Sequence, residues 1–80
     1  MHLLCHFETK NYADWKAEFD GDMEKRMTAG LTLMQMWQGV DEPAQVTCLF
    51  EANDRARAES WLNTEAGFGQ AVTSYFLRTV

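Results

Sequence analysis

The spacing of hydrophobic and polar positions changes several times along the chain, and each change marks an expected element. Residues 2–8 are rich in apolar side chains and carry few charges, which predicts a strand. From Asn11 onward, large apolar residues recur every three or four positions, the spacing of one helix face. These residues are Tyr12, Trp15, Phe19, Met23 and Met27. The pattern predicts one helix that begins after Asn11 as its cap and ends at Gly30.

The second half of the chain predicts a hairpin, a helix and a last strand. Residues 31–38 and 44–51 are strand-like, and residues 39–43 join them as a turn. Asn53 or Asp54 caps a helix over about 54–63, and Thr64 caps a short helical turn through Phe68. Residues 72–79 make the last strand.

The resulting order, βαββαβ, indicates an α+β fold of ferredoxin-like topology over residues 1–80 as a single domain. Right-handed crossovers then give a four-stranded antiparallel sheet with two helices on one face. The other sheet face stays bare unless a partner covers it. We therefore expect a homodimer.

The large share of apolar side chains also favours a homodimer. Hydrophobic residues make up 46% of the 80 positions, with three Trp, five Phe and five Met. A chain this short buries only about 60–65% of its unfolded surface. We interpret the excess as surface buried against a partner subunit, and an unusually dense monomeric core is the alternative.

The net charge and the cysteine content limit the expected partners and the expected cellular compartment. The net charge is −5, and the longest basic run is Lys25-Arg26, so neither nucleic acid nor an anionic membrane is an expected partner. There is no signal-peptide pattern, and no apolar run approaches the roughly 20 residues of a membrane helix. Two Cys far apart in the sequence fit a reducing compartment. We expect a cytoplasmic protein.

Local motifs exclude three classes of ferredoxin-like protein. The central strands lack the aromatic motifs of an RNA-recognition module, and Cys5 does not begin a Cys-x-x-Cys metal-chaperone motif. The first Arg of the chain is Arg26, so the early phosphate cradle of an acylphosphatase is absent.

Several segments do resemble a known family. They are residues 11–19, 29–31, 41–43, 49–51 and 53–54. Through them, nearly the whole chain resembles the dimeric α+β barrel superfamily. Within it the chain is most similar to small proteins near antibiotic-biosynthesis monooxygenases, polyketide cyclases and stress-responsive barrel proteins.

The resemblance implies two sheets paired into a barrel, and a ligand cavity in each subunit between its sheet and its helices. Cofactor-free monooxygenases of this kind use Asn, Trp and Tyr side chains there, and haem-degrading relatives use Asn, Trp and a His. Trp61 sits where those families often place a Trp. The first strand offers Cys5-His6-Phe7 where an Asn is expected.

His6 is the candidate catalytic residue, because histidine can transfer protons near neutral pH. It shares a strand face with His2, Leu4 and Glu8, and the alternative is a hydrogen-bonded interface residue. His2 and His6 lie about 13 Å apart along a strand, so they cannot chelate one metal ion, and we expect no metal site.

Aromatic residues are the candidate ligand pocket. Together with Met23, the residues Trp15, Phe19 and Trp61 either fill the core or, with Tyr75 or Phe76, line a cavity for a flat aromatic or polyketide-like ligand. Cys5 and Cys48 should lie side by side beneath the helices as buried free thiols, with a redox pair as the alternative.

The functional hypothesis is a small-molecule-binding dimeric α+β barrel protein. Its catalytic form is a cofactor-independent oxygenase or cyclase that acts on an aromatic or polyketide-like compound. The alternative is a non-catalytic ligand-binding or assembly module.

Overall fold

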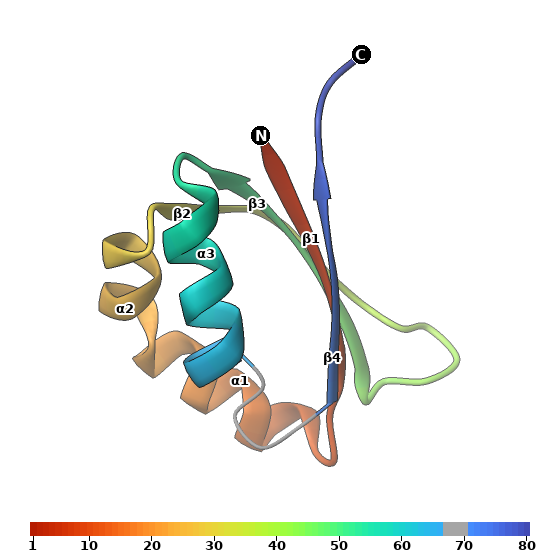
Figure 1. Cartoon of the computed structure of the whole chain (residues 1–80). Coiled ribbons are helices and arrows are strands. Elements are labelled where there is room, and N and C mark those ends of the chain that lie inside the picture. The colour runs from red at the N-terminus through yellow and green to blue at the C-terminus, as the bar shows by residue number, and fades with distance from the viewer. Residues whose placement is uncertain (67–70) are drawn as a thin grey trace.

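Four antiparallel strands form a single sheet, and the helices pack on one face of it (Figure 1). The computed structural model describes residues 1–66 and 71–80. The elements in chain order are β1 (His2–Glu8), α1 (Tyr12–Gly21), α2 (Met23–Thr28), β2 (Leu31–Gln38), β3 (Gln45–Ala52), α3 (Arg55–Trp61), the π-helical turn η1 (Leu62–Ala66) and β4 (Ala71–Leu77).

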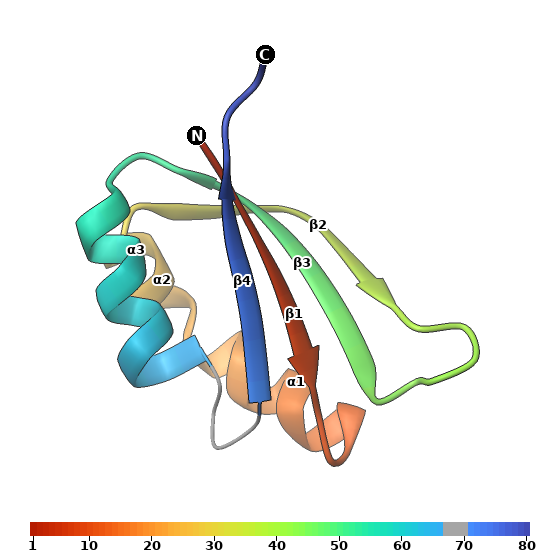
Figure 2. The same ribbon diagram turned by 45° about the vertical axis from the view of Figure 1, so that its right-hand side comes forward.

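The strand order is β2-β3-β1-β4, as Figure 2 shows. This order and the position of the helices confirm the ferredoxin-like α+β fold expected from the sequence. The strand bounds agree with expectation to within two residues. The short turn expected from Thr64 through Phe68 is a π-helical turn over its described part, and Phe68 lies outside the described residues.

Helix caps lie where the sequence predicted them. The Asn11 side chain accepts a hydrogen bond of 3.0 Å from the backbone N–H of Asp14, and Asp54 accepts one of 3.0 Å from Arg57. Each bond satisfies a donor that the first helical turn leaves free. Gly30 has φ of 76°, the left-handed conformation that stops α2.

The expectation of one helix from residue 11 to Gly30 was wrong, because the helix is broken after Gly21. Asp22 has φ of −93° and ψ of 8° and separates α1 from α2. Asp22 and Arg26 continue the spacing of the buried Trp15 and Phe19, and both are buried. Met23 and Met27, expected to face inward, are exposed.

The Arg26 side chain is held by groups from α1. Its guanidinium lies 3.7 Å from the centroid of the Phe19 ring and donates a hydrogen bond to the Phe19 carbonyl. A cation above an aromatic face is stabilised by the ring quadrupole. Arg26 is therefore buried, whereas the helical spacing had predicted that its neighbour Met27 would be buried.

The core lies between the helices and the inner sheet face. On β1 and β3 the buried side chains alternate, and they are Leu3, Cys5, Phe7, Val46, Cys48 and Phe50. Trp15 packs 4.9 Å from both Phe7 and Phe19, measured between ring centroids, and Trp61 packs edge-on 5.6 Å from Phe50. Aromatic pairs with tilted, stacked or edge-on rings add to the stabilisation that burial provides.

A register shift in β2 sets which of its side chains face the helices. Leu33 is paired with Phe50 and Gln35 with Leu49, so Met34 is an extra residue between them. Beyond the bulge, Trp37 is paired with Thr47 and lies on the sheet face opposite the helices.

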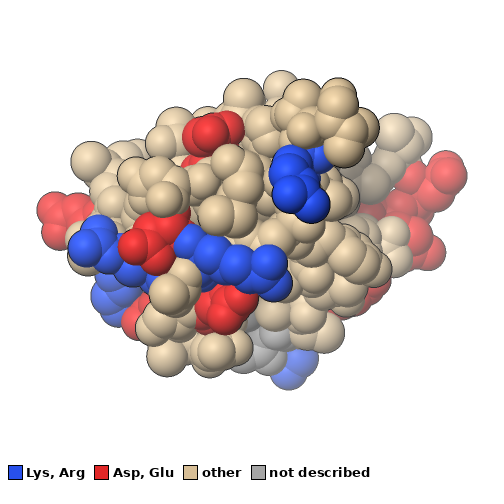
Figure 3. All heavy atoms as spheres, turned by 45° about the horizontal axis from the view of Figure 1, so that its top comes forward, with Lys and Arg blue, Asp and Glu red and all other residues tan. Residues whose placement is uncertain are grey.

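No helix in residues 1–66 or 71–80 is long and apolar enough to cross a membrane. Figure 3 shows acidic and basic side chains close together on one side of the molecule.

Candidate functional site

The sheet face without helices is the part of the structure that combines polar chemistry with exposed apolar surface. We call it the outer face, defined by His2, Leu4, His6 and Glu8 of β1 and the residues paired with them. The alternation of side chains in strands puts these positions on one face. Figures 1 and 2 show no helix of the described chain over it.

The outer face consists of rows that run across the strands. The first row holds Glu51, His2 and Leu77. The second holds Leu49, Leu4 and Tyr75 and is apolar apart from the tyrosine hydroxyl. The third holds Thr47, His6 and Thr73, and the fourth holds Gln45, Glu8 and Ala71. An apolar row thus lies between two rows that each contain a histidine.

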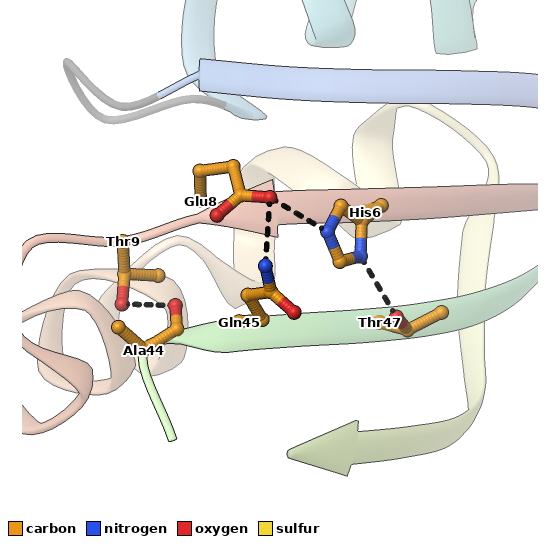
Figure 4. A network of polar contacts seen from close by, with 6 residues as sticks. All are labelled: His6, Glu8, Thr9, Ala44, Gln45 and Thr47. Carbon is orange, nitrogen blue, oxygen red and sulfur yellow. Dashed lines mark hydrogen bonds and ion pairs between the residues drawn. The ribbon is translucent and has the colours of Figure 1, made fainter. Parts of the chain in front are cut away.

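His6 is the centre of a hydrogen-bonded network (Figure 4). Its Nε2 lies 3.0 Å from Oε1 of Glu8, and its Nδ1 lies 3.1 Å from Oγ1 of Thr47. The same Glu8 oxygen accepts a hydrogen bond of 3.2 Å from the Gln45 side chain. Residues of two neighbouring strands therefore hold the imidazole through both of its nitrogens.

The chemistry of the partners determines how the ring is used. An ionised carboxylate only accepts hydrogen bonds, so Nε2 must carry a proton toward Glu8. In a neutral ring Nδ1 then has no proton and accepts from the Thr47 hydroxyl. Nδ1 is consequently the nitrogen that can take up a further proton.

A second histidine on the same face has a simpler environment. His2 Nε2 lies 3.1 Å from Oε2 of Glu51, and the amino group of Met1 lies 3.8 Å from Oε1 of the same carboxylate. No hydroxyl contacts the other nitrogen of His2 among the hydrogen bonds of residues 1–66 and 71–80. The two histidines therefore each have a carboxylate partner at Nε2, and they differ in the hydroxyl that contacts Nδ1 of His6.

The five site residues expected from the sequence are divided between the two faces of the sheet. Trp15, Phe19 and Trp61 lie in the core with only 3%, 1% and 3% of their surfaces exposed. Tyr75 lies on the outer face with His6 and is 57% exposed, because it is paired with Leu4. The other candidate of the last strand, Phe76, faces the helices and lies 4.6 Å beneath the Arg55 guanidinium.

The two buried tryptophans differ in how their N–H groups are satisfied. Trp61 Nε1 donates a hydrogen bond of 2.7 Å to Oδ2 of Asp22, across the α1–α2 break. Trp15 Nε1 is buried and has no partner in the described part of the chain. An unpaired buried donor costs about 1–3 kcal/mol.

A groove between α2 and α3 was not expected from the sequence. Its volume is about 610 Å³, and its lining includes Thr28, Ala29, Ser60, Trp61 and Thr64. An ion pair of 3.2 Å between Lys25 and Glu65 connects the two walls. Ala29 and Trp61 are buried, and Trp61 was a pocket candidate from the sequence, whereas no pattern in the sequence distinguishes the polar lining residues from ordinary solvated positions.

The two cysteines are paired across β1 and β3, as expected, and both are free and fully buried. Burial raises the pKa of the Cys5 thiol to about 12, with a further contribution from Cys48. Burial likewise raises the pKa of the Cys48 thiol to about 12, against the opposing effect of Arg26 and Lys16. Neither thiol is a nucleophile at neutral pH.

Within the described residues, no three His, Cys, Asp or Glu side chains are placed to hold a metal ion.

Comparison with known proteins identifies the fold. No family model matches the chain, and no curated protein is similar to it in sequence. Its structure superimposes on the crystal structure of a Deinococcus radiodurans protein provisionally ascribed to the antibiotic biosynthesis monooxygenases. The TM-score is 0.62 at 9% identity, over 100% of this chain and 95% of the other. The chain therefore shares the ferredoxin-like α+β fold of that protein, and at 9% identity the likeness is one of fold alone.

Proposed function

We propose that the protein is a homodimeric small-molecule-binding protein in which the outer faces of two copies pack together into a barrel. The observation that carries this proposal is the apolar content of the outer face. Tyr75 and Leu77 of the outer face are 57% and 43% exposed, and Trp37, which is paired with Thr47 on the same face, is 49% exposed. Large apolar side chains exposed on one face favour an interaction surface.

The row pattern suits a two-fold assembly. A C2 interface uses the same patch on both subunits. With the two-fold axis over the apolar row of Leu4 and Leu49, the His2 row of one copy faces the His6 row of the other. Packed sheets lie about 10 Å apart, and the short side chains of Thr47 and Thr73 on either side of His6 fill less of that distance than longer side chains would.

In the catalytic form of the proposal, the ligand is an aromatic or polyketide-like compound and the protein acts without a cofactor as an oxygenase or cyclase. His6 is the proton carrier, and Tyr75, diagonal to it across β1 and β4, positions the ligand. Diagonal neighbours on a sheet face lie about 7–8 Å apart, within reach of an aromatic side chain.

The second candidate is a non-catalytic ligand-binding or assembly module. Two observations favour it: both nitrogens of His6 already have partners, and Trp15, Phe19 and Trp61 pack against their neighbours with almost no exposed surface. In this form the aromatic residues serve packing, and the outer face serves assembly.

Native mass spectrometry tests the assembly and the ligand together. We expect a dimer for the wild-type protein and a monomer for Leu49→Lys, which puts a charge in the apolar row. Met27→Lys is the matched control, because Met27 is exposed on the helix side and its substitution should leave the dimer intact. A wild-type monomer at micromolar concentration would remove the proposal. A dimer that retains a small molecule would support ligand binding and give the mass of the ligand.

A further inference from the structure

The geometry points to Glu8 as the positioning residue for His6, to the Thr47 hydroxyl as the marker of the place where a ligand hydroxyl binds, and to a phenol or an enol as the ligand that gives its proton to Nδ1. This inference rests on the proposed function, because it takes the ligand to lie against the outer face.

Glu8 determines which nitrogen of His6 is free to act as a base. Its Oε1 lies 3.0 Å from Nε2, and a carboxylate at that position requires a proton on Nε2. The Gln45 amide holds the same oxygen from β3. Because Glu8 and His6 are two residues apart on one strand, they share a face and the contact needs no other element.

Thr47 marks the place of the ligand hydroxyl. Its Oγ1 lies 3.1 Å from Nδ1, so the structure already has one hydroxyl in the position from which a proton is donated to His6. A threonine hydroxyl is far too weak an acid to lose its proton to imidazole. A phenol or an enol is much closer in acidity, which is the condition for efficient proton transfer. Rotation of the Thr47 side chain to another staggered position frees Nδ1 for such a ligand.

The neighbouring row provides a surface for the ring of this ligand. Leu4 precedes His6 by two residues on the same face, a separation of about 7 Å. This is the reach of one six-membered ring that carries its hydroxyl at one end. Leu49 and Tyr75 continue the row on either side of Leu4, so the ring lies on apolar surface while its hydroxyl meets Nδ1.

The proton transfer balances within the site. The O–H bond of the ligand breaks and an Nδ1–H bond forms, while the electron pair stays on the ligand oxygen as a phenolate or enolate. The imidazolium then carries a positive charge next to the Glu8 carboxylate, which stabilises it. The other titratable groups of the outer face, in its described part, are His2 and Glu51 in the first row and Tyr75 in the second.

The tautomer of His6 can be measured without any ligand. In ¹⁵N-labelled protein, the ring nitrogens of neutral His6 should report a proton on Nε2 and none on Nδ1. Glu8→Ala should mix the two tautomers, whereas Glu59→Ala, which removes an exposed carboxylate of α3 on the helix side, should leave His6 unchanged. A proton found on Nδ1 of neutral His6 in the wild-type protein would overturn the inference whatever the ligand.

The ligand class is tested with 4-nitrophenol, whose colour reports its ionisation. We expect the wild-type protein to shift bound 4-nitrophenol toward nitrophenolate, and His6→Gln to abolish the shift. The methyl ether, 4-nitroanisole, should bind about tenfold more weakly or worse, because it loses a charge-assisted hydrogen bond. Met27→Lys is the control, because Met27 is exposed on the helix side, and it should behave as wild type.

The outcomes separate this inference from the proposed function. Binding of both probes without a colour shift would overturn the role of His6 and leave a small-molecule-binding dimer. A dimer with the expected His6 tautomer that binds neither probe would overturn the ligand class. A monomer that binds nothing would end the proposed function, and the inference with it.

Discussion

The two buried tryptophans of the core provide a matched experiment on one hydrogen bond. Trp15 and Trp61 are equally buried, and each packs against a phenylalanine ring. They differ in that Trp61 donates to the Asp22 carboxylate, whereas Trp15 Nε1 has no partner among the residues described. Substitution of each tryptophan by phenylalanine removes the same atoms from both positions.

The expected difference follows from these contacts. The lost ring volume costs a similar amount at both positions and cancels to first order. Trp61→Phe also removes a hydrogen bond to a charged group, worth about 1.5–3 kcal/mol, and leaves the buried Asp22 with the nearby charge of Arg26. Trp15→Phe removes an unpaired donor and recovers about 1–3 kcal/mol. We therefore expect Trp61→Phe to be the more destabilising by roughly 2.5–6 kcal/mol.

Equilibrium urea unfolding followed by far-ultraviolet circular dichroism measures this difference, since fluorescence would change with the substitution itself. Protein concentration must be equal in all samples, because association would add to the apparent stability. A double-mutant cycle with Asp22→Ala then isolates the pair, with an expected coupling of about 1.5–3 kcal/mol. Two substitutions that destabilise within about 1 kcal/mol of each other would refute the reasoning, because that would mean equal satisfaction of the two indoles.

Two further predictions concern glycine and cysteine. Gly30→Ala should destabilise the fold by about 1–2 kcal/mol or more, because φ is positive there and a Cβ would overlap Asn53. Gly21→Ala has open space and should stabilise the fold by about 0.5 kcal/mol. Thermal unfolding should show melting temperatures that shift in opposite directions, and equal shifts would contradict the backbone conformation assigned to Gly30. The folded state favours the neutral thiols of Cys5 and Cys48, whose pKa values rise from 9.0 to about 12. The contribution of these thiols to the free energy of unfolding is fully present below pH 9.0. It should fall as the pH rises from 9.0 toward 12, by on the order of 1 kcal/mol per pH unit for each thiol. Urea titrations over that range should show a shallower fall in the Cys5→Ala/Cys48→Ala variant, and rapid alkylation of the native thiols at neutral pH would contradict their burial.

The sequence was sufficient to predict the fold, because the elements have clear boundaries. Asn11 and Asp54 are capping residues, and Gly30 is a stop signal whose conformation the structure confirms. The alternation in β1 and β3 correctly placed Cys5 beside Cys48. These features depend on local chemistry and on a period of two, both of which are readable from one chain.

The break between α1 and α2 could not be predicted from periodicity. A glycine within a helix costs only about 1 kcal/mol, so Gly21 alone does not require a break. Asp22 at the break accepts a hydrogen bond from Trp61, and a contact with a residue so distant in the sequence is not part of the local pattern.

The placement of the candidate site residues depended on sheet register. Tyr75 and Phe76 are adjacent, and only the pairing of β4 with β1 decides which one faces the helices. His6 was correctly placed on one face with His2, Leu4 and Glu8, but its contact with Thr47 depends on the register between β1 and β3. Cross-strand partners of this kind are set by the whole sheet and not by either strand alone.

The bulge in β2 has a consequence for the length of that strand. In a regular strand, loss of one residue moves every later side chain to the opposite face. Met34 is the extra residue opposite a continuous β3, so its loss would leave Gln35, Met36 and Trp37 on the faces they now occupy. Position 34 is thus the place in β2 where proteins of this fold can differ by a one-residue insertion or deletion and keep the same residues on each side of the sheet. An alignment that treats β2 as a rigid, gap-free block would misplace Trp37 in any relative without the bulge.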